Sequence, residues 1–475
     1  MEQTIQVAIF VALTALVALI TYIKCRKVSR DSSDSRDYFL AGGGLSWIVV
    51  AGSLMMTNIS AEQIVGMNGA QTLLVAWWEI AAALGLIILA KWLIPIYYRY
   101  NCTTTTELLE RKYQDKGIRA MVSVLFMLGY AFILLPVVLY TGSLFMKSMF
   151  GLSISVTVLA IIFAVVGAIY AIFGGLRAIA ISDTLNGLGL ILMGLAVSYL
   201  AMHAVDWDLS GVPLERLTLI GDSQSDIPWS TLLTGMIFIQ IFYWGTNMVI
   251  TQRALAAKSV KEAQKGLYAA VVMKLIIPVI VVLPGIVAFK LYGDVGDVAY
   301  GKLVGDLLPS WLSGAFAAVI AGAVLSSFNS CLNSAAALYT CDIHQNYINA
   351  DADVRKIGTR VALLFTLISV ALVPLFARSE SIIALLQQLN GLYSMPVLAA
   401  FICALVFKNV SAKAIKWGLV FGVLLYALFT FVWSPLHFIH LMAITLLTTI
   451  LVTLALNRLL FAGPVVAPAA EPTLD

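Results

Sequence analysis

Long apolar runs alternate with short polar segments along the whole chain of 475 residues. A membrane-spanning helix needs about 20 consecutive apolar residues. No stretch shows the ten-residue alternation of a transmembrane strand barrel. The pattern therefore predicts an all-α membrane protein with about 13 transmembrane helices, surrounded by a lipid bilayer. We place these spans near 4–23, 45–73, 77–98, 118–149, 153–174, 180–204, 229–250, 265–290, 311–342, 357–377, 381–407, 414–433 and 437–460.

One apolar run, from about Leu45 to Ala76, is interrupted by the polar stretch Asn58-Ile59-Ser60-Ala61-Glu62-Gln63. A charge at the centre of a membrane helix costs about 3 kcal/mol or more on insertion. A helix end, with water satisfying the polar groups, is the plain alternative, but apolar sequence continues on both sides. We therefore predict a helix that is broken at mid-depth, with its freed carbonyls and polar side chains facing a ligand cavity.

The basic residues predict the orientation of the chain. Of the 29 Lys and Arg, one, Lys274, lies mid-span, and nearly all others lie at predicted inner ends. The exceptions, at predicted outer ends, are Lys147, Arg216, Lys290, Lys302 and Arg378. The positive-inside rule then predicts a multi-pass protein of the plasma (inner) membrane, with its N-terminus outside and its C-terminus in the cytoplasm.

Spans two to eleven divide into five and five, so successive halves would enter the membrane in opposite directions. Inverted repeats of this kind are a common transporter plan, with the site between the interrupted first spans of each half. The second half begins at 229–250, where Gln240, Tyr243, Trp244, Gly245 and Asn247 interrupt an apolar run. We expect one transporter domain with an extra N-terminal helix (4–23), a first repeat (45–204), an inverted second repeat (229–407) and two extra helices (414–460).

Composition excludes several classes of protein. Hydrophobic residues make up 61% of the chain and charged residues 11%, which excludes a soluble globular domain. No Ser/His/Asp or Cys/His arrangement suggests a nucleophile, and no face suggests nucleic-acid binding. We therefore expect neither an enzyme nor a nucleic-acid partner.

Two isolated charges lie inside predicted spans. Glu79 is the only acid between Gln71 and Lys91, and Lys274 is the only charge between Lys265 and Lys290. They could form a structural ion pair. Because intramembrane ionisable groups usually line a pathway, they could instead bind a polar substrate.

Small residues share one face of the predicted helix 311–342. Ala323, Ser326, Ser327, Ser330 and Ser334 recur at helical spacing. Such a face can mean close helix packing, or its hydroxyl oxygens can coordinate a hard cation. Both interpretations stay open on this pattern alone.

The span near 381–407 contains Asn390-Gly391 and Pro396. Gly and Pro predict a break here, in a hinged helix that can open and close a pathway. Gln387, one turn earlier, would face the cavity.

At this point the chain resembles the sodium:solute symporter family, and within it the sodium/sugar cotransporter branch. The matching stretches run in order over nearly the whole chain. They are Tyr38-Phe39-Leu40-Ala41-Gly42, Asn58 to Gln63, Tyr243-Trp244-Gly245, Gln252 to Ser259, Glu262 to Gly266, Leu283-Pro284-Gly285, Leu332-Asn333-Ser334 and Asp342-Ile343. The resemblance implies a LeuT-like five-plus-five inverted repeat and solute uptake driven by sodium (Na+) as the coupling ion.

The resemblance also implies site residues. A sodium site in the sugar branch combines backbone carbonyls with two serine hydroxyls, and the matching positions are Met56, Ile59, Ala323, Ser326 and Ser327. The sugar contacts match Asn58, Gln63, Glu79, Lys274 and Gln387. Tyr243, with Trp244 beside it, matches the aromatic residue that closes the inner side of the sugar site. A sugar's hydroxyls suit this set, since Glu79 accepts, Lys274 donates and the amides do both.

Some positions depart from the family pattern. Ala82 stands where relatives often have serine, Gln240 replaces an asparagine in the substrate pocket, and Trp78 replaces a tyrosine. These changes leave the identity of the sugar open.

A second sodium site in some relatives matches Asp183, Ser326, position 329 and Ser330. Position 329 is Asn329 here, whose larger amide would crowd a place sized for a hydroxyl. We therefore predict one sodium ion per sugar.

The predicted function is sodium-driven import of a monosaccharide or similar polyol by alternating access. The nearest alternative is the same transporter with another substrate, such as sialic acid, inositol or an amino acid. A non-transporting solute sensor is a further alternative.

Overall fold

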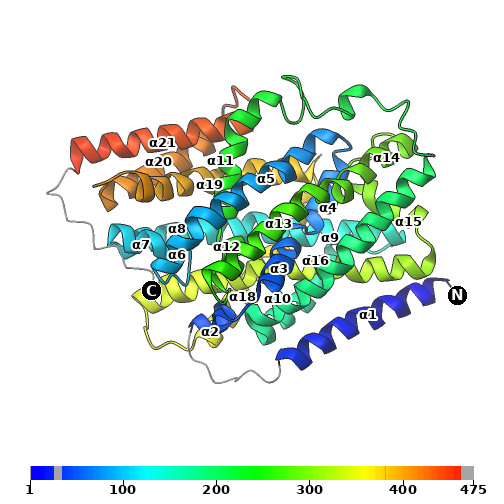
Figure 1. Ribbon diagram of the computed structural model, residues 1–475, viewed down its shortest axis with the longest axis horizontal. Coiled ribbons are helices and arrows are strands. Elements are labelled where there is room, and N and C mark those ends of the chain that lie inside the picture. Colours follow the sequence, from blue (N-terminus) through cyan, green and yellow to red (C-terminus); the bar gives the residue numbers. More distant parts are fainter. Residues whose placement is uncertain (1, 26–34, 380, 462–475) are drawn as a thin grey trace.

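The computed structural model describes residues 2–25, 35–379 and 381–461, and every named element in these ranges is helical (Figure 1). The first half contains α1 (Glu2–Cys25), α2 (Ser35–Phe39), η1 (Ala41–Gly43), α3 (Trp47–Asn58), α4 (Ala61–Gly69), η2 (Leu73–Val75), α5 (Ala76–Ile88), η3 (Leu89–Leu93), α6 (Ile94–Arg99), α7 (Glu107–Tyr113), α8 (Lys116–Gly129), η4 (Tyr130–Leu134), α9 (Leu135–Phe150) and α10 (Val156–Ala204). The second half contains η5 (Leu214–Arg216), η6 (Trp229–Leu233), α11 (Gly235–Gly245), α12 (Met248–Leu255), α13 (Val260–Val281), α14 (Leu283–Tyr292), η7 (Gly296–Val298), α15 (Ala299–Leu307), α16 (Ser310–Ala337), η8 (Leu338–His344), α17 (Gln345–Tyr347), α18 (Val354–Phe376), α19 (Ile382–Val406), α20 (Ala412–Phe431) and α21 (Phe438–Leu460).

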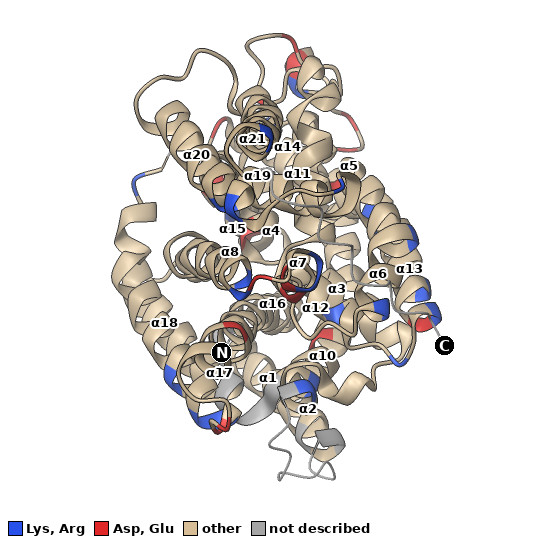
Figure 2. Cartoon of the chain, turned by 90° about the vertical axis from the view of Figure 1, so that its left-hand side faces the viewer, with Lys and Arg blue, Asp and Glu red and all other residues tan. Residues whose placement is uncertain are grey.

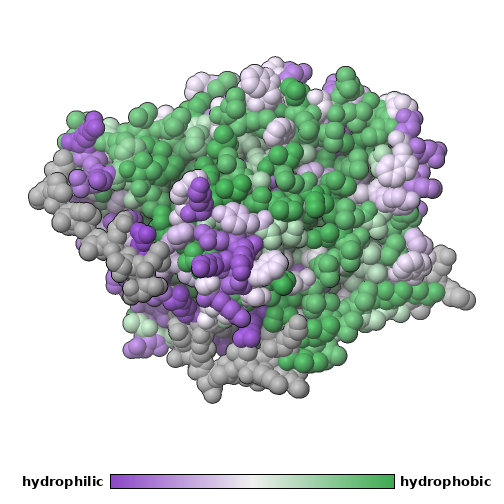
Figure 3. Space-filling view, viewed as in Figure 1, coloured by the Kyte–Doolittle hydropathy of each residue, from purple (hydrophilic) through white to green (hydrophobic). Residues whose placement is uncertain are grey.

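The bundle has the surface of a membrane protein. Apolar side chains cover a broad area between its two ends, and hydrophilic residues gather toward the ends (Figure 3). Lys and Arg are frequent at the end seen in Figure 2, which we call the basic end. In the described ranges, nine helices are long and apolar enough to cross a membrane, and the pair α3–α4 makes a tenth. The other three predicted spans contain shorter apolar helices, at Ile5–Thr21, Val156–Tyr170 and Gly235–Gly245.

The predicted break in the second span is present. Helices α3 and α4 meet at a bend of 50°, where Ser60 is extended, with φ −103° and ψ −178°. The Ser60 N–H donates to the Asn58 carbonyl (2.9 Å). The Met56 carbonyl therefore loses its usual helical donor, four residues on.

The matching break in the second half is also present, between α11 and α12. Asn247 caps α12 by accepting from the Val249 N–H (3.2 Å). The last carbonyls of α11 are satisfied by hydroxyl groups, since Tyr97 donates to Gly245 (2.9 Å) and Thr251 donates to Trp244 (3.1 Å). Such substitutes make a helix break tolerable inside a membrane.

The two predicted spans 153–174 and 180–204 follow one another without a loop, because helical backbone continues between them in α10. The Tyr170 hydroxyl nevertheless donates to the Ala178 carbonyl (3.3 Å), although eight residues of a straight helix span about 12 Å. The helix therefore bends between the two spans.

The predicted break at Asn390-Gly391 and Pro396 is wrong, because α19 is helical from Ile382 to Val406. Gly391 serves a different purpose. A Cβ there would lie 2.2 Å from Cζ of Tyr426, so glycine allows α19 to pack closely against α20.

Glycines also bring α3, α10 and α16 together at the centre of the bundle. A Cβ on Gly187 of α10 would lie 2.9 Å from Cγ of Met56, and one on Gly322 of α16 would lie 2.6 Å from the side chain of Asn186. Small residues at such contacts let membrane helices approach closely. This packing positions the end of α3 against the serine face of α16.

Candidate functional site

One cavity lies at the break between α3 and α4. Its walls come from α3, α4, α5, α11, α13 and α19, together with η4. All eight predicted substrate residues line it: Asn58, Gln63, Glu79, Gln240, Tyr243, Trp244, Lys274 and Gln387. The room left between the side chains is about 40 Å³, which is space for roughly three water molecules. A solute as large as a sugar therefore needs these walls to move apart.

Lys274 and Glu79 form an ion pair in this wall, and both side chains are almost completely buried. The Lys274 ammonium donates to Oε2 of Glu79 and also to Oδ1 of Asn58, at the end of α3. Its Nζ lies 5.2 Å from the centre of the Trp244 ring, over the face of the indole. The pair thus joins α13 and α5 to the broken helix.

Tyr243, Trp244 and Gln240 hold one another in place on α11. The Asn58 amide donates to the Tyr243 hydroxyl (3.3 Å). Trp244 Nε1 donates to Gln240 Oε1 (3.1 Å), and Gln240 Nε2 donates to the carbonyl of Trp78 (3.0 Å). The polar atoms of Gln240 are thus engaged within the wall of the cavity.

Three acceptor oxygens around the cavity have no hydrogen-bond partner in the described residues. They are Oε2 of Glu62, Oε1 of Gln63 and Oε1 of Glu79, and all three atoms are buried. Buried acceptors without donors are costly. Hydroxyl groups of a solute could supply the missing donors.

Sequence reasoning left Glu62, Asn390 and Tyr393 out of the predicted substrate site, yet all three line the cavity. The signal for Glu62 was available, because this acid lies inside the polar stretch that breaks the helix. Tyr393 donates to Asn390 Oδ1 (3.0 Å). No comparable sequence signal marked Tyr393, because tyrosine is common in apolar spans.

The predicted sodium residues lie where α16 meets the end of α3. The Ser327 hydroxyl donates to the carbonyl of Thr57 (3.4 Å), next to Met56. Ser326 is buried near the carboxyl of Asp183, and its hydroxyl forms no hydrogen bond of ordinary geometry with the described residues. With Ala323 one turn earlier and Ile59 at the break, the available ligands are all oxygens, as a hard cation requires.

The predicted second sodium group is also near α3. Asp183 accepts from the Ser53 hydroxyl (2.7 Å), while its other oxygen and Oδ1 of Asn329 are buried without partners in the described residues. Ser330, however, is engaged by a cation. Its hydroxyl accepts from the guanidinium of Arg253.

Arg253, which the sequence predicts at an inner end of the bundle, has a fully buried side chain. It donates to the Val249 carbonyl (2.5 Å) as well as to Ser330. A fixed positive charge at Ser330 disfavours a sodium ion there.

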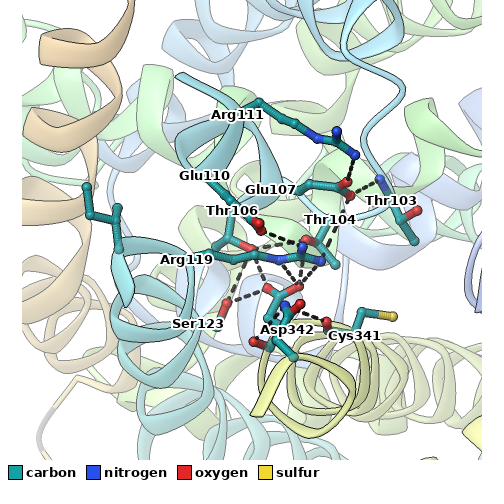
Figure 4. A network of polar contacts seen from close by, with 12 residues as sticks. Thr103, Thr104, Thr106, Glu107, Glu110, Arg111, Arg119, Ser123, Cys341 and Asp342 are labelled. Carbon is teal, nitrogen blue, oxygen red and sulfur yellow. Dashed lines mark hydrogen bonds and ion pairs between the residues drawn. The ribbon is translucent and has the colours of Figure 1, made fainter. Parts of the chain in front are cut away.

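A second polar cluster lies nearer the basic end, around the buried Asp342 of η8 (Figure 4). Its carboxylate accepts hydrogen bonds from Thr104, Thr106, Ser123 and Arg119. Arg119 also pairs with Glu110 of α7 (2.7 Å). This Asp342 network ties η8, which continues the serine helix α16, to α7 and α8.

Comparison with known proteins places the chain in a family. The sodium:solute symporter family matches residues 38–422. The chain belongs to this family. Its members couple solute transport to sodium, so the chain is a multi-pass transporter rather than an enzyme, with sodium as its coupling ion. This confirms the family resemblance.

Several curated proteins are similar along most of their length. The uncharacterized symporter YidK of Escherichia coli K12 is 35% identical, over 96% of this chain and 84% of that protein. A sodium/glucose cotransporter of Vibrio parahaemolyticus is 31% identical, over 94% and 89%. Sodium/myo-inositol cotransporter 2 of Oryctolagus cuniculus is 30% identical, over 88% and 68%.

Solved structures share the fold. A Na+-coupled sialic acid symporter in a substrate-bound outward-open state aligns over 98% of this chain and 99% of its own, with a TM-score of 0.82 and 20% identity. MhsT, in complex with L-phenylalanine, aligns over 87% and 99%, with a TM-score of 0.52 and 14% identity. The predicted LeuT-like inverted-repeat fold is thereby confirmed.

Proposed function

We propose that this sodium:solute symporter imports a monosaccharide or similar polyol by alternating access. One observation carries the proposal. The three unpartnered acceptors of Glu62, Gln63 and Glu79 line the same cavity as the Lys274 ammonium. A polyol supplies many hydroxyl groups, each of which can donate to these oxygens and accept from the ammonium.

The substrate contacts in this proposal are Asn58, Gln63, Glu79, Lys274 and Gln387. Tyr243 covers the apolar face of the sugar ring, as aromatic side chains do at such sites. Trp244 and Gln240 do not contact the sugar in this proposal. Their hydrogen bonds to each other and to the Trp78 carbonyl fix the position of α11 in the cavity wall. The sugar and inositol cotransporters among the relatives support this assignment.

Sodium is proposed to bind between the carbonyls of Met56, Ile59 and Ala323 and the hydroxyls of Ser326 and Ser327. There it would tie the broken helix to α16 and favour the state open to the outside. Each ion entering down a potential of ~100 mV supplies ~2.3 kcal/mol from the electrical term. That is enough to concentrate a solute tens-fold.

The orientation and the membrane belong to the same proposal. The excess of Lys and Arg at the basic end supports a cytoplasmic location for that end of the bundle. This arrangement puts the N-terminus outside and the C-terminus in the cytoplasm of the plasma membrane.

Other solutes remain as alternatives within the same family. Among the described residues, the cavity is lined by Glu62 and Glu79 but by a single cation, Lys274. An acidic solute such as sialic acid would meet this acidic excess without an arginine to pair with its carboxylate. Inositol presents only hydroxyl groups and therefore fits the same proposal.

A binding assay on the purified protein tests the substrate class. Sugars, inositols, sialic acid and amino acids are compared by thermal shift, in sodium and in potassium. We expect a polyol to stabilise the protein in sodium and to do so far less in potassium. A panel in which only an amino acid or an acidic solute stabilises the protein would overturn the proposed substrate class.

A further inference from the structure

A second cavity opens on the side of the bundle and shares no lining residue with the cavity at the broken helix. It has a volume of about 440 Å³ and lies between α8–η4, η8 and α18. Its walls are apolar except for Tyr339, His344 and Arg360. Leu128, Phe132 and Leu364 of this wall are each about half exposed. The walls belong to membrane-spanning helices, so this cavity faces acyl chains rather than water.

The polar residues lie at one end of the groove. Helices α8 and α18 both begin at the basic end, and the groove follows α18 from Ile357 to Ile368 and α8–η4 from Val124 to Phe132. At 1.5 Å per residue these stretches are about 16 Å and about 12 Å long. Arg360 therefore lies one turn from the end nearest the membrane surface, and the length beyond it is apolar. A phospholipid has the same polarity, with a charged headgroup above an apolar chain.

Arg360 has a charge that the described residues do not neutralise. Its guanidinium is exposed and forms no ion pair with them, whereas the nearby Lys356 pairs with Asp353 (3.3 Å). His344 contributes a ring whose Nδ1 is buried without a hydrogen-bond partner in the described residues. An arginine presents paired N–H donors that match the oxygens of a phosphate.

We propose that this groove binds one anionic phospholipid, with an acyl chain along α8 and α18 and its phosphate at Arg360 and His344. Basic pockets between membrane helices are known to hold anionic headgroups. A zwitterionic lipid would also place a phosphate at Arg360, but its choline cation cancels that charge, whereas an anionic lipid brings a net negative charge to balance Arg360.

The groove adjoins the Asp342 network, which joins η8 to α7 and α8. Two walls of the groove, η8 and α8, belong to this network, and His344 lies two residues from Asp342. A lipid held between η8 and α8 would therefore stabilise the arrangement that the network joins.

Lipid retention measured on the purified protein tests the site directly. The full-length protein is exchanged into detergent with phosphatidylglycerol or phosphatidylcholine, and bound lipid is counted by native mass spectrometry. The experiment omits solute and sodium, so its outcome is independent of the proposed transport function. We expect one retained phosphatidylglycerol, and a roughly five-fold weaker retention in Arg360→Ala, as for one basic residue near a lipid surface.

Two further variants distinguish binding in this groove from a general attraction between basic residues and an anionic lipid. Lys261→Ala removes an exposed charge from the first turn of α13, outside the walls of the groove, and should retain phosphatidylglycerol as the wild type does. Val124→Trp fills the groove at an exposed wall residue while keeping Arg360, and it should lose the lipid too. Equal losses in Lys261→Ala and Arg360→Ala would overturn the proposal. Equal retention of phosphatidylcholine and phosphatidylglycerol would also overturn it.

Discussion

Lys274 pairs with Glu79 across the wall of the central cavity, and both side chains are shielded from solvent. The same ammonium donates to Asn58, the last residue before the helix break. Removing one member of a buried pair leaves the other charge unpaired, which is costly. Loss of either residue should therefore lower both the stability of the protein and its proposed binding of solute.

Glu79→Ala and Lys274→Ala should each weaken solute binding, by roughly 1–3 kcal/mol per lost charged hydrogen bond. The double variant Glu79→Gln/Lys274→Met should regain part of the lost thermal stability, because no unpaired charge remains, but it should not regain binding. Solute titration and thermal unfolding measure the two effects separately. Lys356→Ala, in the exposed pair with Asp353, is the control and should bind normally. Normal binding in both folded single variants would show that the pair is only structural.

Ser327→Ala should strongly weaken sodium-driven uptake, because a hydroxyl ligand would be lost between α3 and α16. The measurement is the sodium concentration that gives half-maximal uptake in proteoliposomes. Ser313→Ala removes another buried hydroxyl from α16, near its other end, and should leave that concentration unchanged. Unaltered sodium dependence in Ser327→Ala would exclude the proposed site.

We predict that one sodium ion enters with each solute molecule. Arg253 already occupies the hydroxyl of Ser330, and Asn329 stands where a second site would need a hydroxyl. The reversal potential of solute-coupled current in proteoliposomes reports the number of charges per solute. A value that requires two charges would show that Asp183 and Asn329 complete a second sodium site.

Asp297 in the loop after α14 should make stability depend on pH. Burial raises the pKa of its carboxyl to about 6, although the Ile382 N–H donates to it (3.1 Å). An unfolded aspartate has a pKa near 3.9, so the native state holds this proton more tightly. Below about pH 4 the protonated carboxyl therefore stabilises the native state fully. As the pH rises through 6 this stabilisation is lost, and the free energy of unfolding falls by about 3 kcal/mol at most.

Asp297→Asn should remove this fall in stability with rising pH. The measurement is the unfolding temperature of the detergent-solubilised protein between pH 4.5 and 7. Asp294→Asn, an exposed carboxyl in the same loop, should retain the wild-type pH profile. An Asp297→Asn variant whose unfolding temperature falls as steeply as that of the wild type would contradict the assignment.

Local pattern was enough to predict the helix break, because six consecutive residues from Asn58 to Gln63 place polar groups where apolar ones belong. It failed at Asn390-Gly391 and Pro396, since neighbouring helices can support an unbroken α19 around these residues. Whether Gly marks a hinge or a close contact depends on the partner, which is Tyr426 on another helix.

Long-range pairing was not predictable from the sequence. Arg253 looked like one of many basic residues near an inner end, and only folding reveals that Ser330 and Val249 accept its hydrogen bonds. Asp342 was recognised as part of a matching stretch, but its partners Thr104, Ser123 and Arg119 lie more than 200 residues away in the chain. Residue types alone do not specify such contacts.

Uptake of a labelled solute into proteoliposomes, with and without an inward sodium gradient, tests the central claim most directly. A monosaccharide or polyol should accumulate above its external concentration only with the gradient, and Lys274→Ala should abolish this accumulation. Accumulation of a sugar without sodium would contradict the account, as would sodium-driven accumulation that survives unchanged in Lys274→Ala.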